Sequence, residues 1–85
     1  MKEMSERLAR GDRVRVRSLG SEDWSRGVVH LASDTDPQSA IIELENSMPI
    51  GGGFYMSFVP LTVEYQQERV TDLLTGTELE IEVAG

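Results

Sequence analysis

Apolar and polar residues alternate one by one in several short stretches of this chain, and that pattern constrains its fold most strongly. Residues 13–17 read Arg-Val-Arg-Val-Arg, and residues 78–83 read Glu-Leu-Glu-Ile-Glu-Val. Successive side chains of a β-strand point to opposite faces, so a period of two predicts strands that are buried on one face. The same reasoning predicts strands at 27–32, 40–45, 54–59 and 61–65.

Turn-forming residues separate these stretches. Residues 34–37 contain two Asp and a Pro, which favour a turn. Residues 46–53 read as a loop, because Pro49 cannot donate to a strand ladder and three consecutive glycines end the segment. Residues 66–75 fit either a short helical turn or, with Gly76, a tight hairpin. No segment between the strands is long enough for the crossover helix that parallel strands need. The sequence therefore predicts a mainly β fold, a small antiparallel barrel or sheet roll of five or six strands.

Residues 2–10 follow a helical period instead. Met4 and Leu8 fall on one side, and Glu–Arg pairs four residues apart support a helix. Gly11 stands where a helix commonly ends in a left-handed conformation. We therefore expect a short N-terminal helix. The expected organisation is a single domain over residues 1–85, with residues 1–10 as a peripheral helix and residues 11–85 as the β-barrel.

The net charge of −7 is unevenly divided along the 85 residues. Residues 1–30 hold seven of the eight basic residues against five acids, whereas residues 31–85 hold one arginine against ten acids. Such asymmetry indicates either an interaction arm or two halves that neutralise each other in the fold.

Composition excludes several classes of protein. Hydrophobic residues are 39% of the chain and charged residues 27%, a balance typical of neither a disordered nor a membrane protein. The absence of cysteine excludes disulfides and thiolate metal sites. No apolar run approaches the roughly 18–20 residues that span a bilayer, and the first ten residues do not form a secretory signal. We therefore expect a cytoplasmic protein with no membrane partner.

Arg13, Arg15 and Arg17 project from one face of one predicted strand, which permits two interpretations. Together with Arg26 they could contact the phosphates of a nucleic acid. Alternatively, they could form a cross-strand ladder with glutamates, because the first and last strands of small closed barrels commonly lie side by side. The favoured partners are Glu78, Glu80 and Glu82, with Arg15 and Glu80 as the central pair. The second choice is Glu43 and Glu45. The ladder is the preferred interpretation, since a chain of net charge −7 is repelled by phosphate unless its bases are segregated.

No group of residues in the sequence forms a catalytic or metal-binding set. His30 is the only histidine, and no serine or carboxylate motif accompanies it. Asp34 and Asp36 lack the glycine that a calcium loop requires at its sixth position, where this chain has Ser39. The three glycines at 51–53 are not followed by the Lys-Ser/Thr of a phosphate-binding loop. We therefore expect no enzymatic activity, no cofactor and no metal ion.

The aromatic residues provide the candidate contact surface. Trp24 lies in a turn-rich segment, so its indole either plugs one end of the barrel or stands exposed as a contact residue. Of the three aromatic residues on the middle strand, Phe54, Tyr55 and Phe58, two are expected in the core. Tyr55 lies on the opposite face from the other two and could join Trp24 at a binding site.

The residues from Gly11 to Val16, a loop that carries Trp24, and then Gly27-Val28-Val29 resemble the opening of Src-homology-type and Tudor-like small barrels. In those folds a Gly-Asp turn precedes the first strand, and an aromatic-bearing loop leads to the glycine that starts the second. Members of these families bind peptides, methylated side chains or nucleic acid through aromatic residues of loops and strands. The resemblance implies a binding site at Trp24 and Tyr55, with Asp23 as the acid of a methyl-lysine cage. The tyrosine-rich first strand of the proline-binding versions is absent.

These features together predict a non-enzymatic binding or adaptor domain that contacts a protein or peptide partner, or a second copy of itself as a homodimer. The expected partner-binding residues are Trp24, Tyr55 and Asp23. The alternative function is nucleic-acid binding through the strand face of Arg13, Arg15 and Arg17, together with Arg26.

Overall fold

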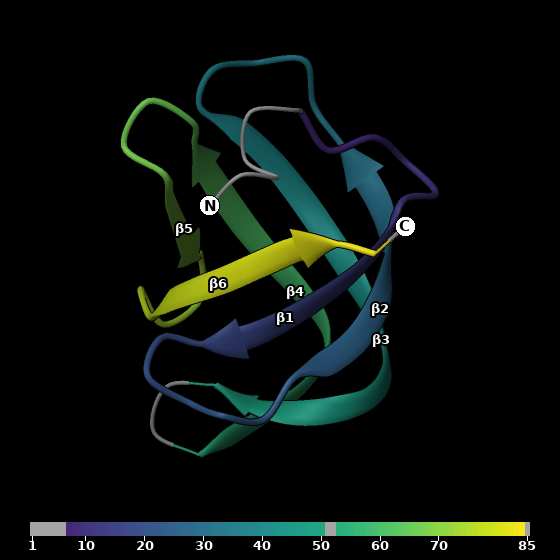
Figure 1. Ribbon diagram of the computed structural model, residues 1–85, viewed down its shortest axis with the longest axis vertical. Helices are drawn as coiled ribbons and strands as arrows, with labels where there is room; N and C mark the ends of the chain where they lie inside the picture. Colours follow the sequence, from purple (N-terminus) through teal and green to yellow (C-terminus); the bar gives the residue numbers. More distant parts are fainter. Residues whose placement is uncertain (1–6, 51–52, 85) are drawn as a thin grey trace.

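Six strands form one closed antiparallel barrel in the computed structural model, which describes residues 7–50 and 53–84 (Figure 1). The strands are β1 (Arg13–Ser18), β2 (Ser25–Ala32), β3 (Gln38–Ile50), β4 (Phe54–Glu64), β5 (Arg69–Asp72) and β6 (Glu78–Val83). Each strand pairs with the next, and β6 returns to pair with β1, which closes the barrel. The predicted mainly β, antiparallel fold is confirmed, and its first and last strands lie side by side.

The alternating apolar residues of the strands fill the barrel interior. On β1, Val14 and Val16 are buried while the arginines between and beside them face outward. On β6, Leu79 and Ile81 are buried in the same way. Burying an aliphatic side chain of this size is worth about 1.5–3 kcal/mol, so this core is the main source of stability.

A β-bulge at His30 interrupts the alternation of β2. Val29 pairs with Ile42 on β3, but two residues later Leu31 pairs with Ile41, so His30 is an extra residue in its strand. A bulge residue changes the face to which the following side chains point. As a result, Val29 is buried in the core whereas Leu31 faces outward and is exposed.

The third strand is longer than the sequence pattern suggests. β3 continues to Ile50, so the loop expected over residues 46–53 is wrong for residues 46–50. Met48 and Ile50 are buried, and Pro49 lies opposite Tyr55 on β4. The ladder between β3 and β4 tolerates Pro49 because its register is irregular just before this point.

The expected helix over residues 2–10 is not seen in the part of it that the structure describes, which begins at Arg7. The rest of the expected helix lies outside the described residues. Leu8 is instead buried in a non-helical conformation, and its N–H donates to Gln38 Oε1 at 3.2 Å and to Tyr65 Oη at 2.9 Å. Its C=O accepts from Gln38 Nε2 at 2.9 Å. These side-chain bonds take the place of the backbone bonds that a helix would supply.

The ambiguous segment 66–75 contains β5 and the start of a hairpin turn into β6. Asp72 organises this turn, because its carboxylate accepts the N–H of Leu74 at 3.3 Å and of Thr75 at 2.8 Å. Gly76 has a φ of 76°, and its N–H donates to the Asp72 C=O at 2.9 Å. β5 and β6 therefore form a hairpin, and the helical interpretation is wrong. The turn is longer than the expected tight turn at Thr75-Gly76, because the Asp72 N–H donates to the Thr77 C=O at 2.9 Å.

The closed six-stranded architecture is compatible with Src-homology-type and Tudor-like barrels. In the described part of the chain, no helix has the length and apolar character needed to cross a membrane.

Candidate functional site

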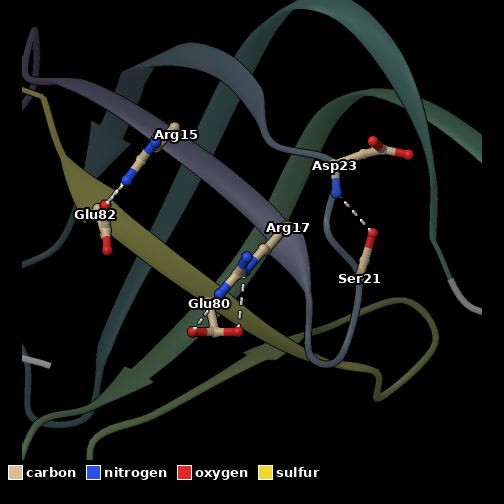
Figure 2. Close-up of polar contacts among 6 residues, drawn as sticks. All are labelled: Arg15, Arg17, Ser21, Asp23, Glu80 and Glu82. Carbon is tan, nitrogen blue, oxygen red and sulfur yellow. Dashed lines mark hydrogen bonds and ion pairs between the residues drawn. The ribbon is translucent and has the colours of Figure 1, made fainter.

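An arginine–glutamate ladder runs along the outer faces of β1 and β6 (Figure 2). Arg15 Nε–H donates to Glu82 Oε1 at 2.8 Å. Arg17 holds Glu80 through two bonds of 3.1 Å and 3.3 Å, one to each carboxylate oxygen. The backbone register places the same residues directly opposite each other. The predicted cross-strand ladder is confirmed, but the expected central pair of Arg15 and Glu80 is wrong, because Arg15 faces Glu82 and Arg17 faces Glu80.

Arg13 and Glu78, the remaining arginine of β1 and the remaining glutamate of β6, lie outside this ladder. Because β1 and β6 are antiparallel, Arg13 lies at the end of the ladder beside Ala84. The Ala84 N–H donates to the Arg13 C=O at 2.7 Å. Glu78 lies at the opposite end, where its C=O accepts from the Leu19 N–H at 3.0 Å, so Arg13 and Glu78 are not partners of each other. The second choice of partner is also wrong, since among the described residues no ion pair joins Glu43 or Glu45 to the arginines of β1.

Trp24 packs on the ladder from outside the barrel. The guanidinium carbons of Arg15 and Arg17 each lie 4.2 Å from the centre of its ring, well within the distance of a cation–π interaction. The residue is half-buried. The indole therefore lies against the outer wall of the barrel and does not plug its end, and the arginines of the same chain occupy part of its surface.

The other two arginines expected to contact nucleic acid border a surface pocket of about 440 Å³. Arg13 and Arg26 line this pocket together with Glu45 and the apolar Val28. A carboxylate beside two guanidinium groups lowers the positive potential on which phosphate binding depends. The four arginines are thus divided into two that are held in ion pairs and two that share a pocket with an acid.

Tyr55 and Asp23 are both exposed. Tyr55 is 71% exposed on β4 and borders a pocket with Leu74 of the β5–β6 turn. Asp23 N–H donates to Ser21 Oγ at 3.2 Å, and its carboxylate points away from the arginine ladder in Figure 2. The structure shows no side-chain contact among Tyr55, Asp23 and Trp24 in the residues that it describes, and a shared binding site at these three residues stays a prediction.

The expectation that two of Phe54, Tyr55 and Phe58 lie in the core is wrong, because Tyr55 and Phe58 are both exposed. The Phe58 ring meets the His30 ring edge-on, with centroids 5.7 Å apart. His30 Nδ1 in turn lies 3.9 Å from Glu43 Oε1. Side chains of β2, β3 and β4 therefore meet on the outside of the barrel.

Four apolar residues, which we call the apolar row, cross the outside of β2, β3, β4 and the turn after β5: Leu31, Ile41, Pro60 and Leu73. Leu31 pairs with Ile41, and Ile41 pairs with Pro60. Leu73 N–H donates to the Pro60 C=O at 2.9 Å, which places the turn beside β4. Leu31 is 49% and Leu73 56% exposed, and the row borders a shallow pocket of about 390 Å³ whose lining residues are all uncharged. Large contiguous apolar patches on protein surfaces are common at interaction sites.

The apolar row could not be predicted from the sequence, because a bulge is not visible in an alternating pattern. Strict alternation puts Val29 and Leu31 on the same face, and the bulge at His30 separates them. One signal was present, since Leu73 and Leu74 are adjacent apolar residues beside a Thr-Gly turn. A short exposed turn cannot bury both of its apolar side chains.

Comparison with protein families, with curated proteins and with solved structures found no significant match to this chain. Within residues 7–50 and 53–84, no three or more His, Cys, Asp or Glu side chains form a group that could hold a metal ion.

Proposed function

We propose that this chain is a non-enzymatic binding module that holds a protein partner through the apolar row. The observation that supports it best is the pocket of about 390 Å³ on the outer wall of the barrel, which the four apolar side chains border. The row is separate from the core that fills the barrel, so its exposed side chains are not needed to close the fold. A bulky apolar side chain of the partner is the expected occupant of the pocket.

The energetics of such a contact favour a small number of anchor residues. Removing apolar surface from water is worth about 25 cal/mol per Å², and the residues near the centre of an interface usually supply most of the binding energy. Leu31 and Leu73 stand at the two ends of the row and are its most exposed members. The uncharged lining of the pocket means that a partner can bury it without desolvating an ionised group.

Nucleic-acid binding is the weaker alternative. Arg15 and Arg17 are already held by carboxylates, so a phosphate would have to compete with Glu82 and Glu80 for them. The net charge of −7 adds a long-range repulsion that opposes the approach of a polyanion.

Selection of random peptides displayed on phage against the immobilised chain tests the proposal. Peptides enriched on the wild type should bind the Leu31→Asp and Leu73→Asp variants at least about tenfold more weakly, because a charge in the pocket must be desolvated on binding. The matched control is Leu19→Asp, which changes a leucine that is 58% exposed and lies outside the apolar row.

The control variant should bind the peptides as the wild type does. Equal binding by the Leu31→Asp and Leu73→Asp variants, or a selection that enriches no peptide, would contradict the proposal. A salt-sensitive shift of short duplex DNA by the wild type would support the alternative function instead.

A further inference from the structure

Residues 7–10, which we call the strap, lie beside the loop that joins β2 to β3 (Figure 1). Leu8 is the buried residue of the strap, and its side chain belongs to the hydrophobic core. Arg7 places its guanidinium carbon 5.3 Å from the centre of the Tyr65 ring and donates to the Thr35 C=O of the loop. The strap is therefore attached to the rest of the barrel at two successive residues.

The side-chain amide of Gln38 joins the strap to this loop. Gln38 is 2% exposed, so an amide atom left without a partner would be buried away from water. Its Nε2 donates one hydrogen to the Leu8 C=O and the other to the Ser33 C=O, both at 2.9 Å. Its Oε1 accepts from the Leu8 N–H at 3.2 Å and from the Tyr65 hydroxyl. The amide thus uses both of its donors and both of its acceptor positions, and two of the four bonds depend on the strap.

Ser33 is at the same time part of the pocket beside the apolar row. Ser33 and Ser39 both line that pocket of about 390 Å³. The Ser33 N–H donates to the Ser39 C=O at 2.8 Å, and the Ser39 N–H donates to the Ser33 Oγ at 2.9 Å. The Ser33 Oγ also bonds the Thr35 Oγ1 at 2.7 Å, and the Thr35 C=O accepts from the strap. Two routes of hydrogen bonds therefore lead from the strap to one wall of the pocket, one through the buried amide and one through the loop threonine.

We propose that the strap holds this wall, formed by Ser33 and Ser39, in the form that binds a partner, with Gln38 as the positioning residue. The inference rests on the proposed function, because it concerns the regulation of the same pocket. The strap belongs to no strand of the barrel, so the strand ladders do not depend on it. Release of the strap removes two partners of the buried amide, which must then turn toward new ones and give up the Ser33 C=O.

This arrangement couples partner affinity to the docking of the strap. A pocket whose wall is held in one form binds more tightly than a pocket whose wall samples several forms, because binding must then select or order the competent form. Any process that draws the strap away from the barrel is therefore expected to weaken the partner complex, although no strap residue lines the pocket.

Amide hydrogen exchange and peptide affinity, both measured on the full chain, test the inference. Gln38→Met keeps an unbranched side chain of similar length and removes the four bonds, so the amides of Ser33 and Ser39 should exchange about tenfold faster or more. The amide of Leu19, which bonds the Glu78 C=O of β6, is the internal reference and should change less. Peptides that phage display has selected on the wild type should bind this variant about tenfold more weakly.

Arg7→Ala and Arg10→Ala form a matched pair that leaves the core unchanged. Both arginines are exposed residues of the strap, but in the described part of the chain only Arg7 bonds the loop. Arg7→Ala should accelerate exchange at Ser33 and Ser39 and weaken peptide binding by about threefold, and Arg10→Ala should change neither.

Faster exchange at Ser33 and Ser39 without weaker peptide binding would overturn the inference, since the wall would then not control the pocket. Unchanged exchange in both Gln38→Met and Arg7→Ala would overturn it as well. Acceleration that is equally large at Leu19 in Arg7→Ala would also do so, because it reports a loss of global stability. A selection that enriches no peptide refutes the proposed function, while the exchange rates still decide whether the strap holds the wall.

Discussion

Gly27 shows how a single residue sets the spacing between two strands. A Cβ at this position would lie 2.5 Å from the Glu43 carbonyl oxygen and 3.1 Å from the Ile42 side chain. The nearest atom belongs to the backbone, so β2 and β3 would have to separate to admit a methyl group. We expect Gly27→Ala to lower the free energy of unfolding by about 1–3 kcal/mol, measured by urea denaturation.

The control for this substitution is Ser47→Ala, at an exposed position of β3. It should change the free energy of unfolding by no more than about 0.5 kcal/mol. If Gly27→Ala were as stable as this control, the close approach of β2 to β3 would be wrong.

At the scale of elements, the ladder between β1 and β6 is a pairing whose register can be measured. Arg17→Glu should destabilise the barrel, and adding Glu80→Arg should recover most of the loss, on the order of 1 kcal/mol, because the pair is partly exposed. Recovery should be incomplete, since the new glutamate cannot make the cation–π contact with Trp24.

The mismatched double variant Arg15→Glu with Glu80→Arg is the control for register. Its two new charges lie diagonally across the strands, because Arg15 pairs with Glu82. Urea denaturation of both double variants should show clearly better recovery for the facing pair. Equal recovery, or recovery only in the mismatched variant, would mean that the register is shifted.

Elements could be predicted from the sequence where alternation is unbroken, and not where a ladder is irregular. β1 and β6 were predicted because each apolar residue points inward without interruption. The bulge at His30 depends on how β2 meets β3, and a single strand's sequence does not encode it. Pro49 indicated a loop because proline cannot donate to a ladder, yet β3 continues through it. The apolar row could not be predicted for the same reason, since the exposure of Leu31 is a consequence of the bulge.

At the scale of the whole molecule, closure of the barrel brings a basic strand against an acidic one. The basic first part of the chain contributes β1, and the acidic remainder contributes β6, so part of the charge asymmetry is neutralised within the fold. The pocket beside the apolar row is lined by uncharged residues only. In a molecule this acidic, uncharged and apolar surfaces are where a protein partner can be held with least desolvation of charge.

The central claim, that a partner binds at the apolar row, is tested most directly by nuclear magnetic resonance. The methyl-labelled chain would be titrated with a peptide that phage selection has enriched on the wild type. We expect the methyl resonances of Leu31, Ile41 and Leu73 to shift with peptide concentration while the indole N–H of Trp24 stays in place. Shifts centred on Trp24, with the three methyl-bearing residues unchanged, would contradict the account.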